Sequence, residues 1–320
     1  MNNTGNIIGA VVIAVIVTGW LIAGSVYFIL QRMDSEPEAG PIIQIEEYIE
    51  ETEIIETEII AETTQTETAS YDTVKSARPA YDIIIQAGQS NSMGGGLGEV
   101  DAPYEINDAV WYFNSDFTFC EAFEREHEGE LIGNFSLTFA QDYVKNGLLA
   151  EGRRLLIIRS AEGGSGFSDF RWGPDDDLQL RMIGMIAAAL ELNPENKLVA
   201  FLWHQGETDA TLNATRDGHY KNLITLIDKV RTTFDDNELP FVAGDFVPHW
   251  KTENEAIAAP VIAAIRDVCA DIGYAGFVET DGLLSNDEKI GDGNTSHFSR
   301  EALYEMGRRY FREFMKIKNA

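Results

Sequence analysis

Short apolar runs alternate with stretches of helical periodicity over the C-terminal three-quarters of the chain. Runs of this length with few polar interruptions are typical of strands buried on both faces of a sheet. The predicted strands are 81–86 (YDIIIQ), 154–159 (RLLIIR), 198–203 (LVAFLW), 241–245 (FVAGD) and 274–279 (YAGFVE). Helices are predicted near 135–146, 176–192, 217–235, 254–271 and 299–316, the last with Ser299 as its N-cap. This alternation predicts a three-layer α/β/α domain with a parallel sheet, covering residues 80–320.

The N-terminal part of the chain has a different pattern. Residues 7–30 form an uncharged apolar run of 24 residues, long enough to cross a bilayer core of ~30 Å. A cleaved signal peptide is the alternative, but the run is longer than a usual signal sequence and no Lys or Arg precedes it. We therefore expect an uncleaved transmembrane anchor within 1–32. Arg32, on its C-terminal flank, weakly favours a cytoplasmic location for the residues that follow.

Residues 33–79 have the composition of a linker. Twelve acidic residues and no Lys or Arg lie between positions 33 and 70, and the pentad ETEII at 51–55 is repeated at 56–60. A period of five fits neither a helix nor a strand, and like charges repel one another, so the pattern predicts a solvated, extended segment. Self-association through its isoleucines is the alternative.

Charge and cysteine content exclude several classes of protein. The 320 residues contain 24 Lys and Arg against 53 Asp and Glu, a formal net charge of −29. Such a surface repels phosphate backbones, so nucleic acid is not an expected partner. The only cysteines, Cys120 and Cys269, lie outside any CxxC pattern, which excludes a zinc ribbon, an iron–sulfur site and a disulfide-rich scaffold. The sequence does not decide whether Cys120 and Cys269 form one disulfide or remain two free thiols.

Polar loops follow the first two predicted strands along the chain, at the sheet edge where α/β proteins bind ligands. The first loop reads AGQSNSMGGG from position 87, and its Ser90 is placed for nucleophilic attack, with its own N–H available to an oxyanion. An N-capping serine in a Gly-rich turn is the alternative. The second, SAEGGSGF at 160–167, has glycines that allow backbone N–H groups to approach a ligand. It could equally be a flexible turn.

Two further loops contain an amide and a histidine. After the third strand comes HQGETD at 204–209, where the Gln205 amide can donate to an oxyanion. His204 and Glu207 are too few ligands for a metal site and lack the H-E-x-x-H spacing, so no metal is expected. The last loop, GDGNTSHFS at 291–299, offers His297 as a general base. By itself this loop could be an ordinary loop before a helix. Together the four loops supply the nucleophile, the base and the oxyanion donors that acyl transfer requires.

The four blocks AGQSNSMG, RSAEGGSGFSDFRW, WHQGETD and DGNTSHFSREALYEMGRRYF resemble, in this order, the sialate O-acetylesterase and acetylxylan-esterase-like branch of the SGNH hydrolases. The resemblance covers about 80–320. It implies a flavodoxin-like fold and deacetylation of O-acetylated carbohydrates without metal or cofactor. By position it implies Ser90 as nucleophile and His297 as base. It implies an oxyanion hole of the Ser90 and Gly164 N–H groups and the Gln205 amide. Gln89 and Asn91, beside the nucleophile, are expected to bind substrate.

The sequence departs from the family pattern at the acid. The family places it three residues before the histidine, as D-x-x-H, but that position is Asn294 here. The nearest acid is Asp292, five residues before His297, and we expect it to complete the triad if the loop re-aims it. Glu207 is the reserve acid. A Ser–His dyad would still operate at reduced efficiency, because the carboxylate mainly orients and stabilises the imidazolium.

The sequence therefore predicts a membrane-anchored serine esterase that removes O-acetyl groups from sialate- or xylan-type carbohydrates through an acetyl-serine intermediate. Such a substrate favours an extracytoplasmic catalytic domain. The alternatives are a catalytically degenerate glycan-binding module and an adhesion or scaffold protein. Aromatic residues between 111 and 119 are expected to be mostly core, with a sugar-stacking platform as the other interpretation.

Overall fold

The computed structural model describes residues 79–320. The predicted anchor, and all but the last residue of the predicted linker, lie outside these described residues. No helix within 79–320 is long and apolar enough to span a membrane.

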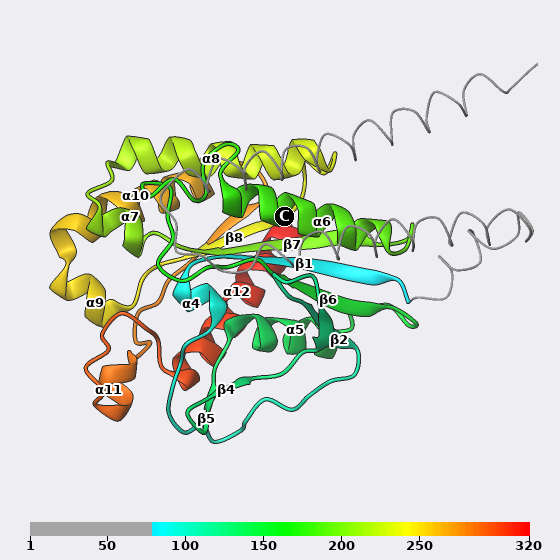
Figure 1. Ribbon diagram of the computed structural model, residues 1–320, viewed down its shortest axis with the longest axis horizontal. Helices are drawn as coiled ribbons and strands as arrows, with labels where there is room; N and C mark the ends of the chain where they lie inside the picture. The colour runs from blue at the N-terminus through cyan, green and yellow to red at the C-terminus, as the bar shows by residue number, and fades with distance from the viewer. Residues whose placement is uncertain (1–78) are drawn as a thin grey trace, which may run out of the picture. The chain divides into compact units, whose positions relative to one another are not determined.

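A mostly parallel sheet forms the centre of the domain, with strand order β3-β2-β6-β1-β7-β8-β9 (Figure 1). Its strands are β1 (Tyr81–Gly88), β2 (Val110–Phe113), β3 (Phe119–Glu121), β6 (Arg154–Arg159), β7 (Lys197–His204), β8 (Phe241–Gly244) and β9 (Ala275–Val278). Only β3, at one edge, pairs antiparallel to its neighbour. A separate hairpin consists of β4 (Arg125–His127) and β5 (Glu130–Ile132).

Helices cover both faces of this sheet. Figure 1 shows α6, α8 and α10 on one face and α5 and α12 on the other. The longer helices are α5 (Phe135–Lys145), α6 (Asp177–Glu191), α8 (Arg216–Thr233), α10 (Glu255–Asp271) and α12 (Arg300–Lys318). Four short helices, α4 (Ser90–Met93), α7 (Glu207–Thr211), α9 (Pro248–Glu253) and α11 (Asn286–Ile290), lie in the loops. The predicted α/β/α architecture is confirmed.

The five strands predicted from apolar runs are the consecutive strands β6-β1-β7-β8-β9 of the sheet. Numbered in order along the sequence, they have the flavodoxin-like order 2-1-3-4-5, in which the chain reverses direction across the sheet between β1 and β7. Ligands of such folds bind beyond the carboxyl ends of the strands at this switch point. The five predicted helices are also present, and the Ser299 side chain caps α12 by accepting the N–H of Ala302 at 3.3 Å.

The region between 98 and 134 was not predictable as secondary structure, and it supplies β2, β3 and the β4–β5 hairpin. The aromatic residues between 111 and 119 were expected to be mostly core, and the structure agrees for some of them. Tyr112 and Phe113 are buried in the core, whereas Phe117 is 51% exposed. Both cysteines are free thiols, so the disulfide alternative is excluded.

The close approach of β1 and β7 at their carboxyl ends depends on one glycine. Gly88 has φ +125°, and a Cβ at this position would lie 2.1 Å from the carbonyl oxygen of His204. The next residue, Gln89, donates its N–H to that same oxygen at 2.9 Å. Only glycine combines this backbone conformation with this approach, and the result is a fixed start for the serine-bearing turn.

Candidate active site

A pocket of about 340 Å³ lies beyond the carboxyl ends of the central strands. Its walls come from all four loops that the sequence singled out. They are formed by Gln89, Ser90, Gly164, Glu207, Thr208, Thr211, Trp250, Ser296 and His297. The fold thus brings Ser90, Gly164 and His297 to one cavity, although they are far apart in the sequence.

Ser90 is the first residue of α4, directly after β1. A first-turn N–H has no acceptor inside its own helix, so the Ser90 N–H is free to bind a ligand oxygen. Gly164, across the pocket, adopts φ +65° with open space where a Cβ would stand. Its backbone can therefore approach a ligand closely. Ser90 and His297 line the same pocket. No hydrogen bond joins their side chains within residues 79–320.

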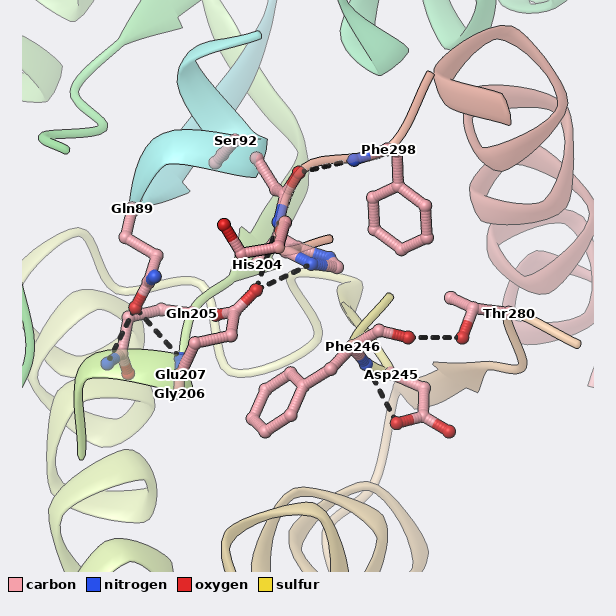
Figure 2. Close-up of polar contacts among 12 residues, drawn as sticks. Gln89, Ser92, His204, Gln205, Gly206, Glu207, Asp245, Phe246, Thr280 and Phe298 are labelled. Atoms are coloured by element: carbon pink, nitrogen blue, oxygen red, sulfur yellow. Dashed lines mark hydrogen bonds and ion pairs between the residues drawn. The ribbon is translucent and has the colours of Figure 1, made fainter. Parts of the chain in front are cut away.

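The side chain of Gln89 connects the serine turn to the start of α7. Its Oε1 accepts the N–H groups of Gly206 at 3.3 Å and Thr208 at 3.2 Å, and the Gln205 amide lies 3.4 Å away (Figure 2). Helix-start N–H groups need such an acceptor. The oxygen expected to bind substrate is therefore engaged within the protein.

Asn91 holds the histidine loop from both sides of His297. Its Nδ2 donates to the carbonyl oxygen of Ser296 at 2.9 Å, and its Oδ1 accepts the N–H of Phe298 at 3.2 Å. The same Nδ2 lies 3.0 Å from Glu207 Oε1. Asn91 is buried and does not line the pocket. The structure places this residue, expected at the substrate, behind the site as a tie between α4 and the His297 backbone.

The residue against the His297 ring is Asn294. Both polar atoms of its amide lie near His297 Nδ1, Nδ2 at 2.8 Å and Oδ1 at 3.1 Å. Oδ1 also accepts the backbone N–H of His297 at 3.2 Å. Asn294 thus occupies the place of the triad carboxylate, as its position three residues before the histidine indicates.

Asp292, the acid that the sequence favoured, lies elsewhere. It is exposed, and its Oδ1 accepts the N–H of Asn294 at 2.8 Å. No hydrogen bond joins it to His297 among residues 79–320. Burial lowers the pKa of His297, and the more distant charge of Asp292 opposes that shift.

The reserve acid, Glu207, lines the pocket, and among residues 79–320 no hydrogen bond or ion pair joins it to His297 either. Its Oε1 accepts from Asn91 and lies 3.8 Å from His204 Nε2, as Figure 2 shows for the His204 pair. Its Oε2 is buried with no hydrogen-bond partner in the described part of the chain. Burial raises the pKa of Glu207 to about 7. A carboxyl that is half-protonated near neutral pH is poorly suited to stabilise an imidazolium.

Gln205 is fully buried and does not line the pocket. Nε2 donates to Asp209 Oδ2 at 2.7 Å. The same carboxylate accepts the N–H groups of Phe167 at 3.1 Å and Ser168 at 2.6 Å. Asp209 thereby ties the glycine loop to α7.

Asp209 lies within the HQGETD block, but the sequence alone gave no signal for its role. Burial by itself would raise its pKa, but hydrogen bonding and the charge of His219, with the Ser168 and Gln205 donors, lower it to about 2. A carboxylate that is charged at neutral pH and accepts three hydrogen bonds is a firm anchor, and this one fixes the loop that presents Gly164.

The assembled groups are those of acyl transfer: a serine hydroxyl, an imidazole and backbone donors around one cavity. Within residues 79–320 no group of three or more His, Cys, Asp or Glu side chains is arranged to hold a metal ion. These groups lie on a flavodoxin-like α/β/α fold, whose serine and histidine loops stand at the switch point of the sheet.

Residues 80–316 match the family described as carbohydrate esterase, sialic acid-specific acetylesterase, and the chain belongs to this family. The crystal structure of NanS is similar, with a TM-score of 0.63 at 18% identity over 75% of this chain and 98% of NanS. A protein from Arabidopsis thaliana has a TM-score of 0.57 at 17% identity over 75% of this chain and 99% of its own. No curated protein matches the sequence significantly. The predicted family is confirmed.

Proposed function

We propose that this carbohydrate esterase removes O-acetyl groups from carbohydrates by a metal-independent serine mechanism. The observation that carries the proposal is the convergence of Ser90, Gly164 and His297 on one pocket. Family membership supports the class of substrate, an acetylated carbohydrate.

In the first half-reaction His297 takes the proton of the Ser90 hydroxyl while Ser90 Oγ attacks the acetyl carbonyl carbon. The oxyanion that forms accepts hydrogen bonds from the N–H groups of Ser90 and Gly164. The bond between the acetyl carbon and the sugar oxygen then breaks, and the histidine returns its proton to the leaving oxygen. In the second half-reaction His297 activates a water that hydrolyses acetyl-Ser90 to acetate and free serine.

Asn294 orients the base in this mechanism. When its Oδ1 accepts the Nδ1 proton of His297, the lone pair of Nε2 is left free to receive the serine proton. An amide does this orienting without the negative charge that would stabilise the imidazolium. We therefore propose a Ser–His–Asn arrangement, with Asp292 acting through its charge at longer range.

The oxyanion hole in this proposal has two backbone donors. Gln205, the third donor expected from the sequence, donates to Asp209 in the structure. Its part in oxyanion binding stays a prediction, and its part in fixing the glycine loop rests on the contacts with Asp209.

We also propose that residues 7–30 anchor the chain in a membrane and that the esterase domain is extracytoplasmic. The length of the uncharged run supports the anchor. The location is supported by the substrate class alone.

The test is acetate release by the full-length chain and its Ser90→Ala variant, using 4-nitrophenyl acetate and acetylated carbohydrates. Loss of the nucleophile should lower kcat by roughly 10³-fold or more. Ser168→Ala is the matched control, because Ser168 directly follows the glycine loop, does not line the pocket, and keeps in this variant the backbone N–H that donates to Asp209. Carbohydrate binding without serine-dependent acetate release would contradict the esterase and favour a binding module.

A further inference from the structure

A second cavity, the arginine pocket, is lined by Ser92 and Met93 of α4, the helix that begins with Ser90. It has a volume of about 350 Å³ and is enclosed by α4, the β2–β3 hairpin and the ends of β4 and β6. The residues that matter here are Ser92, Met93, Tyr112, Phe123, Arg125 and Arg159. None of the catalytic assignments uses this cavity.

Its two arginines have no carboxylate partner among the described residues. Arg159 Nη2 donates to the carbonyl oxygen of Met93 at 3.0 Å, and Arg125 approaches the same oxygen at 3.5 Å. Arg159 stacks over the Tyr112 ring at 4.6 Å, and its Nε is buried without a hydrogen-bond partner. By contrast, Arg300 forms a paired bridge with Glu124 nearby.

Unpaired cations are notable because this region of the chain is acidic. Beyond residue 70 the sequence holds 41 acidic against 23 basic residues, a net charge of −18. Asp116 also lines the cavity, but its carboxylate accepts from the N–H and hydroxyl of Thr118 and forms no ion pair with either arginine. Partial burial, and then the charge of Arg159, lower the pKa of Arg125. Two neighbouring cations with donors to spare form a site for an anion.

The arginine pocket is close to the nucleophile. Ser90 and Met93 are the first and last residues of α4, so they are separated by ~4.5 Å along its axis. The 161–164 segment also borders both cavities, with Ala161 on one and Gly164 on the other. The two cavities are therefore neighbours that share α4 and the 161–164 segment.

We propose that the arginine pocket binds the carboxylate of an O-acetylated sugar acid whose acetyl ester lies at Ser90. This inference rests on the proposed esterase function and narrows its substrate. The planar guanidinium of Arg159 matches a carboxylate in geometry and charge. Phe123, 40% exposed at the same cavity, offers an apolar surface to the carbon skeleton. Sialic acids and uronic acids share this carboxylate, and neutral acetylated xylan lacks it.

The experiment compares Arg159→Gln and Arg125→Gln with wild type in the full-length chain. Arg154→Gln is the matched control, since Arg154 lies at the opposite end of β6, stacks over Trp111 at 5.0 Å and likewise has no carboxylate partner among the described residues. Substrates are O-acetyl sialic acid, its carboxyl methyl ester, acetylated galacturonate oligomers, acetylated xylo-oligosaccharides and 4-nitrophenyl acetate. Binding of O-acetyl sialic acid is measured separately in Ser90→Ala protein by calorimetry.

Arg159→Gln should raise KM for at least one acidic sugar by roughly 10- to 100-fold, as expected for the loss of a charge-assisted hydrogen bond. The KM of Arg159→Gln for the methyl ester, the xylo-oligosaccharides and the aryl acetate should stay within about twofold of the wild-type KM. Whether the sialate or the galacturonate responds identifies the source of the carboxylate. An equal loss on neutral esters, or the same loss in Arg154→Gln, would overturn the subsite.

The two proposals fail in different ways. If Ser90→Ala retains esterase activity, the catalytic assignment is wrong, while the binding measurement still reports on the arginine pocket. If hydrolysis depends on Ser90 but Arg159→Gln leaves acidic-sugar binding unchanged, the esterase stands and the carboxylate subsite is wrong.

Discussion

At the scale of single residues, the site is built by polar side chains that hold other groups in place. Asn91 fixes the backbone on both sides of His297, and Asp209 fixes the loop of Gly164. Asn294 contacts the imidazole itself. The sequence pointed to the loops of Ser90 and His297 and to the unusual Asn294 position, because these depend on local spacing. It could not identify which side chain reaches His297 Nδ1, because that depends on how the 291–299 loop folds.

Replacing Asn294 with aspartate tests the orienting residue. Asn294→Asp puts a carboxylate within hydrogen-bond distance of Nδ1, where it would fix the tautomer and stabilise the imidazolium. We expect kcat/KM for 4-nitrophenyl acetate to rise by roughly tenfold or more, with a raised pKa in the acidic limb of the pH–rate profile.

The variant Asp292→Asn distinguishes the two assignments of the acid. Because Asp292 is exposed and hydrogen-bonded to the Asn294 backbone, its loss should change kcat/KM by only a few-fold. A fall of roughly 10³-fold or more would show that Asp292 is the functional triad acid after all.

At the scale of elements, the site exists because several strand ends converge. Continuous apolar runs predicted the central strands and helices well, since burial on both faces leaves a strong local signal. The β2–β3 hairpin left no such signal. Its strands are only four and three residues long, and β2 joins the sheet by pairing with β6, which is distant in the sequence. The same contact creates one wall of the arginine pocket.

The turn from β1 into α4 gives a test at this scale. Gly88→Ala would force a Cβ into the His204 carbonyl group at 2.1 Å, so we expect a loss of more than about 3 kcal/mol in the free energy of unfolding. Gly152→Ala is the control, because Gly152 also has positive φ, +79°, but nothing lies within 4 Å of the place that its new methyl group would occupy. It should cost only about 1 kcal/mol. Urea titration followed by circular dichroism measures both, and equal losses would contradict the close-approach explanation.

At the scale of the whole molecule, one buried carboxyl group makes the free energy of unfolding depend on pH. Glu207 is only 6% exposed, and burial raises its pKa to about 7 from an ordinary 4.5. The folded state therefore holds this proton more tightly than the unfolded chain. The resulting stabilisation is complete below about pH 4.5 and is lost as pH rises to about 7.

Replacing Glu207 with glutamine should remove this dependence. Glutamine keeps an oxygen for Asn91 and has no titrating proton, so the stability of Glu207→Gln relative to wild type should increase by about 3 kcal/mol between pH 4.5 and pH 8. Urea unfolding at several pH values measures the difference. The exposed residue Glu191 provides the control variant, Glu191→Gln, which makes the same substitution on the surface of α6. A pH-independent difference for Glu207→Gln would show that the carboxyl titrates normally.

The sequence by itself determined the five central strands and the five longer helices, the family, and the loops that carry Ser90, Gly164 and His297. These features follow from apolar periodicity and from short motifs, which are properties of neighbouring residues. Only the tertiary structure decided that Asn294 rather than Asp292 contacts His297, that Gln89 and Asn91 are engaged within the protein, and that Arg125 and Arg159 share a cavity. Each of these outcomes depends on groups distant in sequence competing for the same hydrogen bond or the same space, and that competition is settled only when the sheet brings them together.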